Sequence, residues 1–232
     1  MTMVTGVRSW GEALSRAWHG PAAGRVFAIA GVVAAGVYVA GDVVSGLLYP
    51  GYSFRDQWIS ELTARGSPVR PVMLGVMTLH GLLGAGLALG IWRSAGGSRS
   101  LRPVGPLLVT AGAVGFFTHV VFPMSSRGMR PSFSDTMHMA LSMAWGVVTF
   151  SAMILYAIAY QGWPRVCSIL TFAVMLGFGT ASSIAIQGIE ENDTPWAGAF
   201  ERINAYTLMA WLVVVAVTVM PPYPRDGQPE RG

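Results

Sequence analysis

Three acidic residues stand where a carboxyl group could do acid chemistry rather than carry a surface charge. Asp42 lies inside a long apolar stretch, Glu61 lies in a polar segment, and Glu201 begins the last apolar stretch. A carboxylic acid in an apolar environment can keep its proton near neutral pH and donate it to a substrate. The sequence therefore predicts general-acid catalysis by these three residues.

Other polar and aromatic residues could organise the acids or bind a substrate. Asp135 and His138 are three residues apart, so they share one face of a helix and could position the acids. Arg202 could hold a carboxylate or an anionic substrate head through its planar guanidinium group. The predicted catalytic residues are Glu61, Glu201, Asp42, His138 and Asp135. The predicted substrate-binding residues are Tyr52, Arg55, Trp58, Ser60, His80, Phe117, His119, Arg202 and Tyr206.

The same residues also have structural interpretations, which the sequence leaves open. Glu61 could cap the segment that follows it, or pair with Arg55 or Arg65. Asp135 could complement the dipole of the helix that it begins. The histidines could pack as buried, neutral rings.

Metal chemistry fits the histidine spacing less well. Asp135, His138, His119 and His80 could gather a zinc ion, which takes histidine and carboxylate ligands. However, no two histidines have i, i+4 spacing and no Glu-x-x-His sequence occurs. The chain also lacks a P-loop and a glycine-rich dinucleotide fingerprint. We therefore predict no bound metal and no cofactor, and a metal-dependent transmembrane hydrolase remains an alternative.

The elements that must position these residues are long and apolar. Of the 232 residues, 53% are hydrophobic and 11% are charged, against roughly 25% charged residues in an average soluble domain. Six stretches are close to the roughly 20 residues that a bilayer crossing needs. The sequence predicts an all-α, polytopic integral membrane protein with six transmembrane helices in a single bundle, at residues 26–48, 71–92, 103–122, 135–160, 166–188 and 201–220. Ser134 is the expected N-cap of the fourth helix.

The segments outside the predicted six-helix domain, 26–220, have their own expectations. Residues 1–25 are predicted to be cytoplasmic or interfacial, with Trp10, Leu14 and Trp18 on one face of an amphipathic helix. Residues 221–232 are predicted to be a disordered tail. The side of a membrane protein that carries more arginine and lysine usually faces the cytoplasm. Nine of the fifteen arginines fall on the side of the two termini. We therefore expect both termini in the cytoplasm of a cell-membrane protein.

Most of the acids fall on the opposite, outer side of the predicted bundle. Eight of the eleven acidic residues lie there, and polar groups inside a membrane tend to face a bundle interior or a wet cavity. The segment between the first two helices is rich in aromatic and charged residues, so we expect it to fold over the outer mouth of the bundle.

That segment also carries a recognisable pattern. It reads Gly-Tyr-Ser-Phe-Arg-Asp-Gln-Trp-Ile-Ser-Glu-Leu from Gly51 to Leu62. Together with Phe122-Pro123, His138 and the Glu201-Arg202 pair, it resembles the family known as domain of unknown function 998 over nearly all six helices. The resemblance implies a shared fold and a shared set of polar residues, and it leaves the function open.

Two classes of function fit these observations. The first is an integral membrane enzyme that uses carboxylate general-acid chemistry on an isoprenoid or lipid, in a cyclisation or isomerisation like that of a terpene cyclase. Aromatic rings would then stabilise a carbocation. The second is a lipid-binding, solute-binding or proton-coupled transport protein, in which Asp42 and His80 form a proton relay. The expected partners are the lipid bilayer and a lipophilic small molecule; no nucleic acid is expected, and the oligomeric state stays open.

Overall fold

Six long helices make up most of the computed structural model, which describes residues 21–219. Each is long and apolar enough to cross a membrane. They are α2 (Pro21–Leu48), α3 (Arg70–Ser94), α4 (Val104–Val121), α5 (Phe133–Ala159), α6 (Trp163–Ala185) and α7 (Ala197–Val219). Two short 3-10 helices, η1 (Ile59–Thr63) and η2 (Ile186–Gly188), lie in the connections. The prediction of an all-α bundle with six membrane-spanning helices is confirmed.

Several helices begin earlier than the sequence pattern predicted. The chain is already helical at Pro21, five residues before the expected start, and α7 begins at Ala197, so that Glu201 lies in its second turn. The prediction of Ser134 as N-cap was wrong. Ser132 caps α5, because the carboxylate of Asp135 accepts hydrogen bonds from the Ser132 backbone N–H at 2.7 Å and from its hydroxyl at 2.6 Å. Of the predicted flanking segments, residues 1–20 and 221–232 lie outside the described residues.

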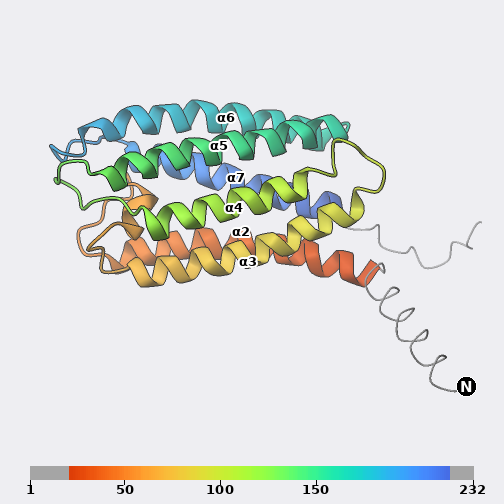
Figure 1. The fold of residues 1–232 in the computed structure, drawn as a ribbon, viewed down its shortest axis with the longest axis horizontal. Helices are drawn as coiled ribbons and strands as arrows, with labels where there is room; N and C mark the ends of the chain where they lie inside the picture. Colours follow the sequence, from red (N-terminus) through yellow and green to blue (C-terminus); the bar gives the residue numbers. More distant parts are fainter. Residues whose placement is uncertain (1–20, 220–232) are drawn as a thin grey trace, which may run out of the picture.

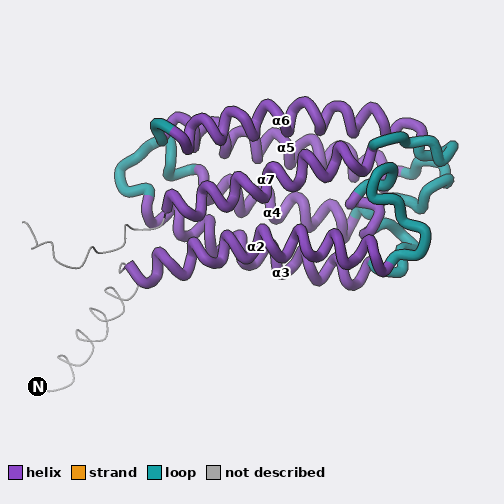
Figure 2. Tube along the Cα trace, turned by 180° about the vertical axis from the view of Figure 1, so that it is seen from behind, coloured by secondary structure: helices purple, strands orange, loops and turns teal. Residues whose placement is uncertain are grey.

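The helices run lengthwise side by side (Figure 1). Helix α2 packs against α3 and α7, α6 packs against α7 and α5, and α4 packs against α3 and α5. Pro21 of α2 and Val219 of α7 lie at one end, which we call the terminal end. At the opposite end, the segments 49–69, 122–132 and 186–196 gather over the helices (Figure 2). We call this the loop end.

Glycines allow some of these helices to approach closely. A Cβ atom on Gly105 of α4 would overlap the carbonyl oxygen of Ala88 on α3. On α2, a Cβ on Gly31 would lie 2.7 Å from a methyl group of Leu87. Small residues at such contacts are typical of helices packed in a membrane, where close van der Waals approach replaces the hydrophobic effect.

The segment 49–69 is docked on the bundle, as the sequence predicted. The backbone N–H of Ala199, in the first turn of α7, donates to the carbonyl oxygen of Arg55 at 2.8 Å. Trp58 is buried, and its indole N–H donates to the hydroxyl of Ser182 on α6 at 2.7 Å. Gly198 of α7 makes this docking possible, because a Cβ atom on residue 198 would overlap the backbone carbonyl oxygen of Gln57.

Gly198→Ala tests how strictly the docking depends on this contact. The added methyl group would also lie 2.8 Å from Phe54 O, so the segment must shift, at a cost of about 1–3 kcal/mol. We expect a lower thermal unfolding temperature in detergent. Gly75→Ala is the control, since a Cβ there meets nothing within 4 Å. Equal unfolding temperatures for the two variants would contradict the docking described.

Candidate functional site

A buried ion pair joins α2 to α7 near the loop end. The side chain of Asp42 is fully buried, and Arg202 donates to its two carboxylate oxygens from Nε and Nη2, each at 2.9 Å. The hydroxyl of Tyr206, one turn further along α7, donates to Asp42 Oδ2 at 2.5 Å. Asp42 therefore has a partner at both oxygens, which accounts for a carboxylate inside an apolar helix.

The remaining donors of Arg202 bind the docked segment. Nη1 donates to the carbonyl oxygens of Phe54 and Gln57, each at 2.9 Å, and of Gly198 at 3.2 Å. Nη2 also donates to the hydroxyl oxygen of Tyr52 at 2.6 Å. Because a guanidinium group has five N–H donors, all of them are engaged. Arg202 therefore holds the carboxylate of Asp42, and it has no donor left for an anionic substrate head.

Tyr52 extends this network into the segment 49–69. Its hydroxyl donates to the carbonyl oxygen of Trp58 at 2.8 Å. Burial raises the pKa of Tyr52 above its ordinary value, so the side chain is a neutral hydrogen-bonding group at physiological pH. These contacts give Tyr52 a role in positioning the segment, and its role in substrate binding stays a prediction.

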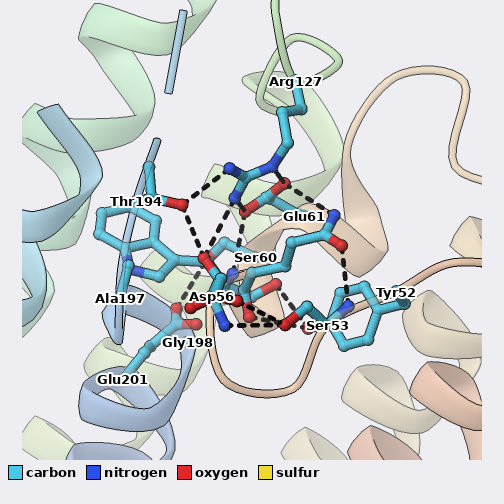
Figure 3. A network of polar contacts seen from close by, with 12 residues as sticks. Tyr52, Ser53, Asp56, Ser60, Glu61, Arg127, Thr194, Ala197, Gly198 and Glu201 are labelled. Carbon is cyan, nitrogen blue, oxygen red and sulfur yellow. Dashed lines mark hydrogen bonds and ion pairs between the residues drawn. The ribbon is translucent and has the colours of Figure 1, made fainter. Parts of the chain in front are cut away.

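A second ion pair lies among the loops, and its basic partner was missed by sequence reasoning. Arg127 donates to Glu61 Oε2 from Nε at 2.9 Å and to Oε1 from Nη2 at 2.6 Å (Figure 3). The same guanidinium donates to Thr194 Oγ1 at 2.7 Å and to the carbonyl oxygen of Asp56 at 3.2 Å. Arg127 thus joins all three segments of the loop end. In the sequence, Arg127 is one arginine in a short connection, and no spacing or motif links it to Glu61.

The predicted capping role of Glu61 is present. Its Oε1 accepts a hydrogen bond from the backbone N–H of Trp58 at 2.9 Å, which caps η1. The ion-pair partner of Glu61 is Arg127, and not Arg55 or Arg65 as predicted. Arg55 pairs with its neighbour Asp56 instead. With a guanidinium donor on each oxygen, Glu61 is poorly placed to deliver a proton to a substrate.

Glu201 differs from these two carboxylates. Its Oε2 accepts a short hydrogen bond from the backbone N–H of Ile59, and its Oε1 accepts one from the hydroxyl of Ser60 at 3.0 Å. Figure 3 shows Glu201 below the segment that contains Ser60. Among the described residues, its hydrogen-bond donors are all neutral. Tyr38 of α2 packs against the apolar cluster that contains Ile59, the residue whose backbone N–H donates to Glu201.

Asp135 and His138 lie in a different part of the loop end. Asp135 Oδ1 accepts from the backbone N–H of Ser125 at 2.7 Å, in addition to capping α5. The Nδ1 atom of buried His138 lies 2.8 Å from the carbonyl oxygen of Phe122. Both residues fasten the segment 122–132 to α5, and neither is hydrogen-bonded to Asp42, Glu61 or Glu201 in the described structure.

The other predicted histidines are also held by structural contacts. His119 Nδ1 lies 2.7 Å from Thr63 Oγ1, and the His119 and His138 rings are 5.0 Å apart. His80 Nδ1 lies 2.9 Å from Ala34 O. Asp42 is bound by Arg202 and Tyr206, and no hydrogen bond joins it to His80 in the described part of the chain. Within residues 21–219, no group of three or more His, Cys, Asp or Glu side chains is placed to hold a metal ion.

Two predicted substrate-binding residues lie at the surface. Phe117 is 49% exposed on α4, where a membrane would cover it. The Arg55 side chain is 61% exposed, and its guanidinium carbon lies 5.5 Å from the centre of the Trp196 ring. The hydrogen bond from Arg55 holds the pKa of Asp56 down at about 2. Asp56 is therefore charged at any physiological pH and pairs with Arg55.

Arg202→Lys tests whether the five-donor arrangement stabilises the fold. A lysine has three donors, so some of the bonded oxygens would be left unsatisfied, at about 1–3 kcal/mol each when buried. We expect a clearly lower unfolding temperature in detergent. Arg65→Lys is the matched control, because Arg65 is exposed. If both variants unfold at the same temperature as the wild-type protein, the network contributes little to stability.

Comparison with known proteins identifies a family. No curated protein and no solved structure matches the chain. The family model described as "Protein of unknown function (DUF998)" matches residues 32–218, which run from α2 to α7 and include both ion pairs. The expected resemblance is confirmed, and this chain belongs to the DUF998 family.

Proposed function

We propose that the protein is an integral membrane enzyme that acts on a lipophilic substrate, with Glu201 as its general acid. The observation that carries the proposal is the set of neutral donors around Glu201. A carboxyl group with neutral donors and no guanidinium partner is less firmly held in its ionised form than one paired with arginine, so it is the kind that can hold and deliver a proton near neutral pH.

The contrast with the other two predicted acids supports this choice. Asp42 and Glu61 each have both oxygens bonded to an arginine. Because each oxygen already accepts from a guanidinium group, neither carboxylate offers a free oxygen to a substrate, which suits a structural role. General-acid chemistry is therefore assigned to Glu201, and Asp42 and Glu61 become positioning residues.

We assign the aromatic ring of such a reaction to Tyr38. It packs against the cluster that contains Ile59, which donates to Glu201, and its ring centre is 5.2 Å from that of His80. An aromatic face can stabilise a positive charge that develops when a double bond is protonated. An isoprenoid or another unsaturated lipid is thus the proposed substrate class.

Glu201→Gln tests the proposal, because glutamine keeps the volume and removes the transferable proton. The purified protein in lipid nanodiscs would be incubated with a total membrane lipid extract, and conversion followed by mass spectrometry. We expect the variant to lose at least about a hundredfold in turnover while its unfolding temperature stays near that of the wild type.

Glu191→Gln is the control for this experiment, since Glu191 lies exposed in the segment 186–196. It should convert lipid at the wild-type rate. Wild-type turnover by Glu201→Gln would exclude Glu201 as the acid. A wild-type protein that leaves every lipid in the extract unchanged would exclude the enzyme proposal.

Binding of a lipophilic molecule is a second candidate function. The observation that favours it is a groove of about 570 Å³ between α6 and α7, with largely apolar walls. This function needs no acid. It would therefore still stand if Glu201→Gln kept the wild-type turnover and Glu201 were excluded as the acid.

We also propose that the protein lies in the cell membrane with its terminal end in the cytoplasm. Nine of the fifteen arginines fall on the side of the two termini and six on the other side. An excess of arginine near the ends of membrane helices and in short connections favours the cytoplasmic side, and acidic residues contribute little to this preference.

Cysteine labelling tests this orientation in a Cys167→Ser background. A membrane-impermeant maleimide should label Glu191→Cys in intact cells and should label Gly97→Cys only after permeabilisation. Both positions are exposed, at the loop end and the terminal end respectively. The opposite labelling pattern would reverse the proposed topology.

A further inference from the structure

The groove between α6 and α7 lies on the face of α7 that points away from Glu201. Ile203, Thr207, Ala210 and Val214 line it at a spacing of three or four residues, so they share one helix face. Arg202 and Tyr206, whose polar atoms bind Asp42, also line the groove. Glu201 is nine residues before Ala210, which places it half a helical turn away in angle. Leu170 and Ile203 at the groove are exposed, so a membrane lipid can reach it.

Two hydroxyl groups in this apolar groove have no hydrogen bond within residues 21–219. They belong to Thr171 of α6, which is only 7% exposed, and to Thr207 of α7. Other hydroxyls of α6 are satisfied by their own helix: Ser168 donates to Pro164 O at 2.8 Å and Thr180 to Leu176 O at 2.7 Å. A hydroxyl in an apolar setting without a partner is costly. The partner is therefore expected from outside the described chain.

The two hydroxyls lie at a similar depth in the bundle. The indole N–H of Trp211 on α7 donates to Ser168 Oγ on α6 at 2.9 Å, which fixes how the two antiparallel helices align. Thr171 lies three residues after Ser168 on α6, and Thr207 lies four residues before Trp211 on α7. Thr171 is about 12 Å from the start of α6, and Thr207 about 15 Å from the start of α7, at 1.5 Å per residue.

This depth restricts the chemistry of the ligand. A hydrocarbon core is about 30 Å thick, so positions 12–15 Å inside a helix are near its middle. The charged headgroup of a phospholipid stays at the surface. Two hydroxyl donors near the middle instead suit a neutral, largely apolar molecule with an oxygen that only accepts hydrogen bonds. The groove, at about 570 Å³, is within the usual size range of small-molecule sites.

We propose that this groove binds a neutral lipophilic carbonyl compound, whose carbonyl oxygen accepts hydrogen bonds from Thr171 and Thr207. The apolar part of the ligand lies against Leu170, Val174 and Val214. This site is separate from the acid proposed for catalysis, so either can be present without the other.

The test compares a long-chain ketone, 2-tridecanone, with tridecane, which has the same carbon chain and no carbonyl group. Complexes with the protein in nanodiscs would be counted by native mass spectrometry. The wild type should bind the ketone in preference to the alkane. The Thr171→Val, Thr207→Val double variant should bind the ketone at least about tenfold more weakly, because two hydrogen bonds are lost.

Matched variants separate the hydroxyl groups from general packing. Thr180→Val removes an α6 hydroxyl that is already bonded to its own helix, and it should bind the ketone like the wild type. Thr171→Ser and Thr207→Ser keep the hydroxyls and should retain binding. Glu201→Gln should also bind normally, which distinguishes this site from the proposed catalytic function.

Two results would overturn the proposal. Equal binding of ketone and alkane to the wild type would mean that ordinary surrounding lipid fills the groove. Unchanged ketone binding by the double valine variant would mean that the carbonyl group is held elsewhere. The first comparison uses only the wild-type protein, so it remains decisive even if the double variant does not fold.

Discussion

The guanidinium group of Arg202 connects the parts of the molecule that form the loop end. It binds Asp42 on α2, carbonyl oxygens at the start of α7 and in the segment 49–69, and the hydroxyl of Tyr52. Without this group, Asp42 would keep only the hydroxyl of Tyr206 as a donor, and the carbonyl oxygen of Phe54 would lose its hydrogen bond. The position of the docked segment, and hence the donors offered to Glu201 by Ile59 and Ser60, depends on it.

Buried ion pairs are not automatically stabilising, because removing two charges from water is costly. Here the cost is offset by complete hydrogen bonding. Asp42 receives donors from two side chains and Arg202 uses all its N–H groups, while Glu61 and Arg127 repeat the two-point contact among the loops. The pairs also specify geometry: each carboxylate fits a planar fork in one arrangement. The two pairs thus define how three segments far apart in the sequence meet.

The sequence was sufficient for the fold because its six apolar stretches have the length that a bilayer demands. The site was harder to predict, because partners such as Asp42 and Arg202 are 160 residues apart and no periodicity links them. Glu201 and Arg202 looked like one functional pair, yet adjacent helix residues point about 100° apart, and the two side chains bind different partners. Asp135 illustrates the reverse case: its local spacing from Ser132 predicts a capping box, and that local role is the one observed.

Polar contacts near both ends of the α6–α7 pair decide how a molecule can reach the space between these helices. At the loop end, Trp58 is bonded to Ser182 of α6, and Arg127 is bonded to Thr194 in the segment before α7. Toward the terminal end, Trp211 of α7 donates to Ser168 of α6. Arg165 also ties the start of α6 to the end of α5, and Tyr156 of α5 is hydrogen-bonded to Thr218 of α7. The unpartnered hydroxyls lie between these two sets of contacts. A molecule dissolved in the bilayer therefore reaches them sideways, from the lipid that faces the groove, and not along the helix axes from either end.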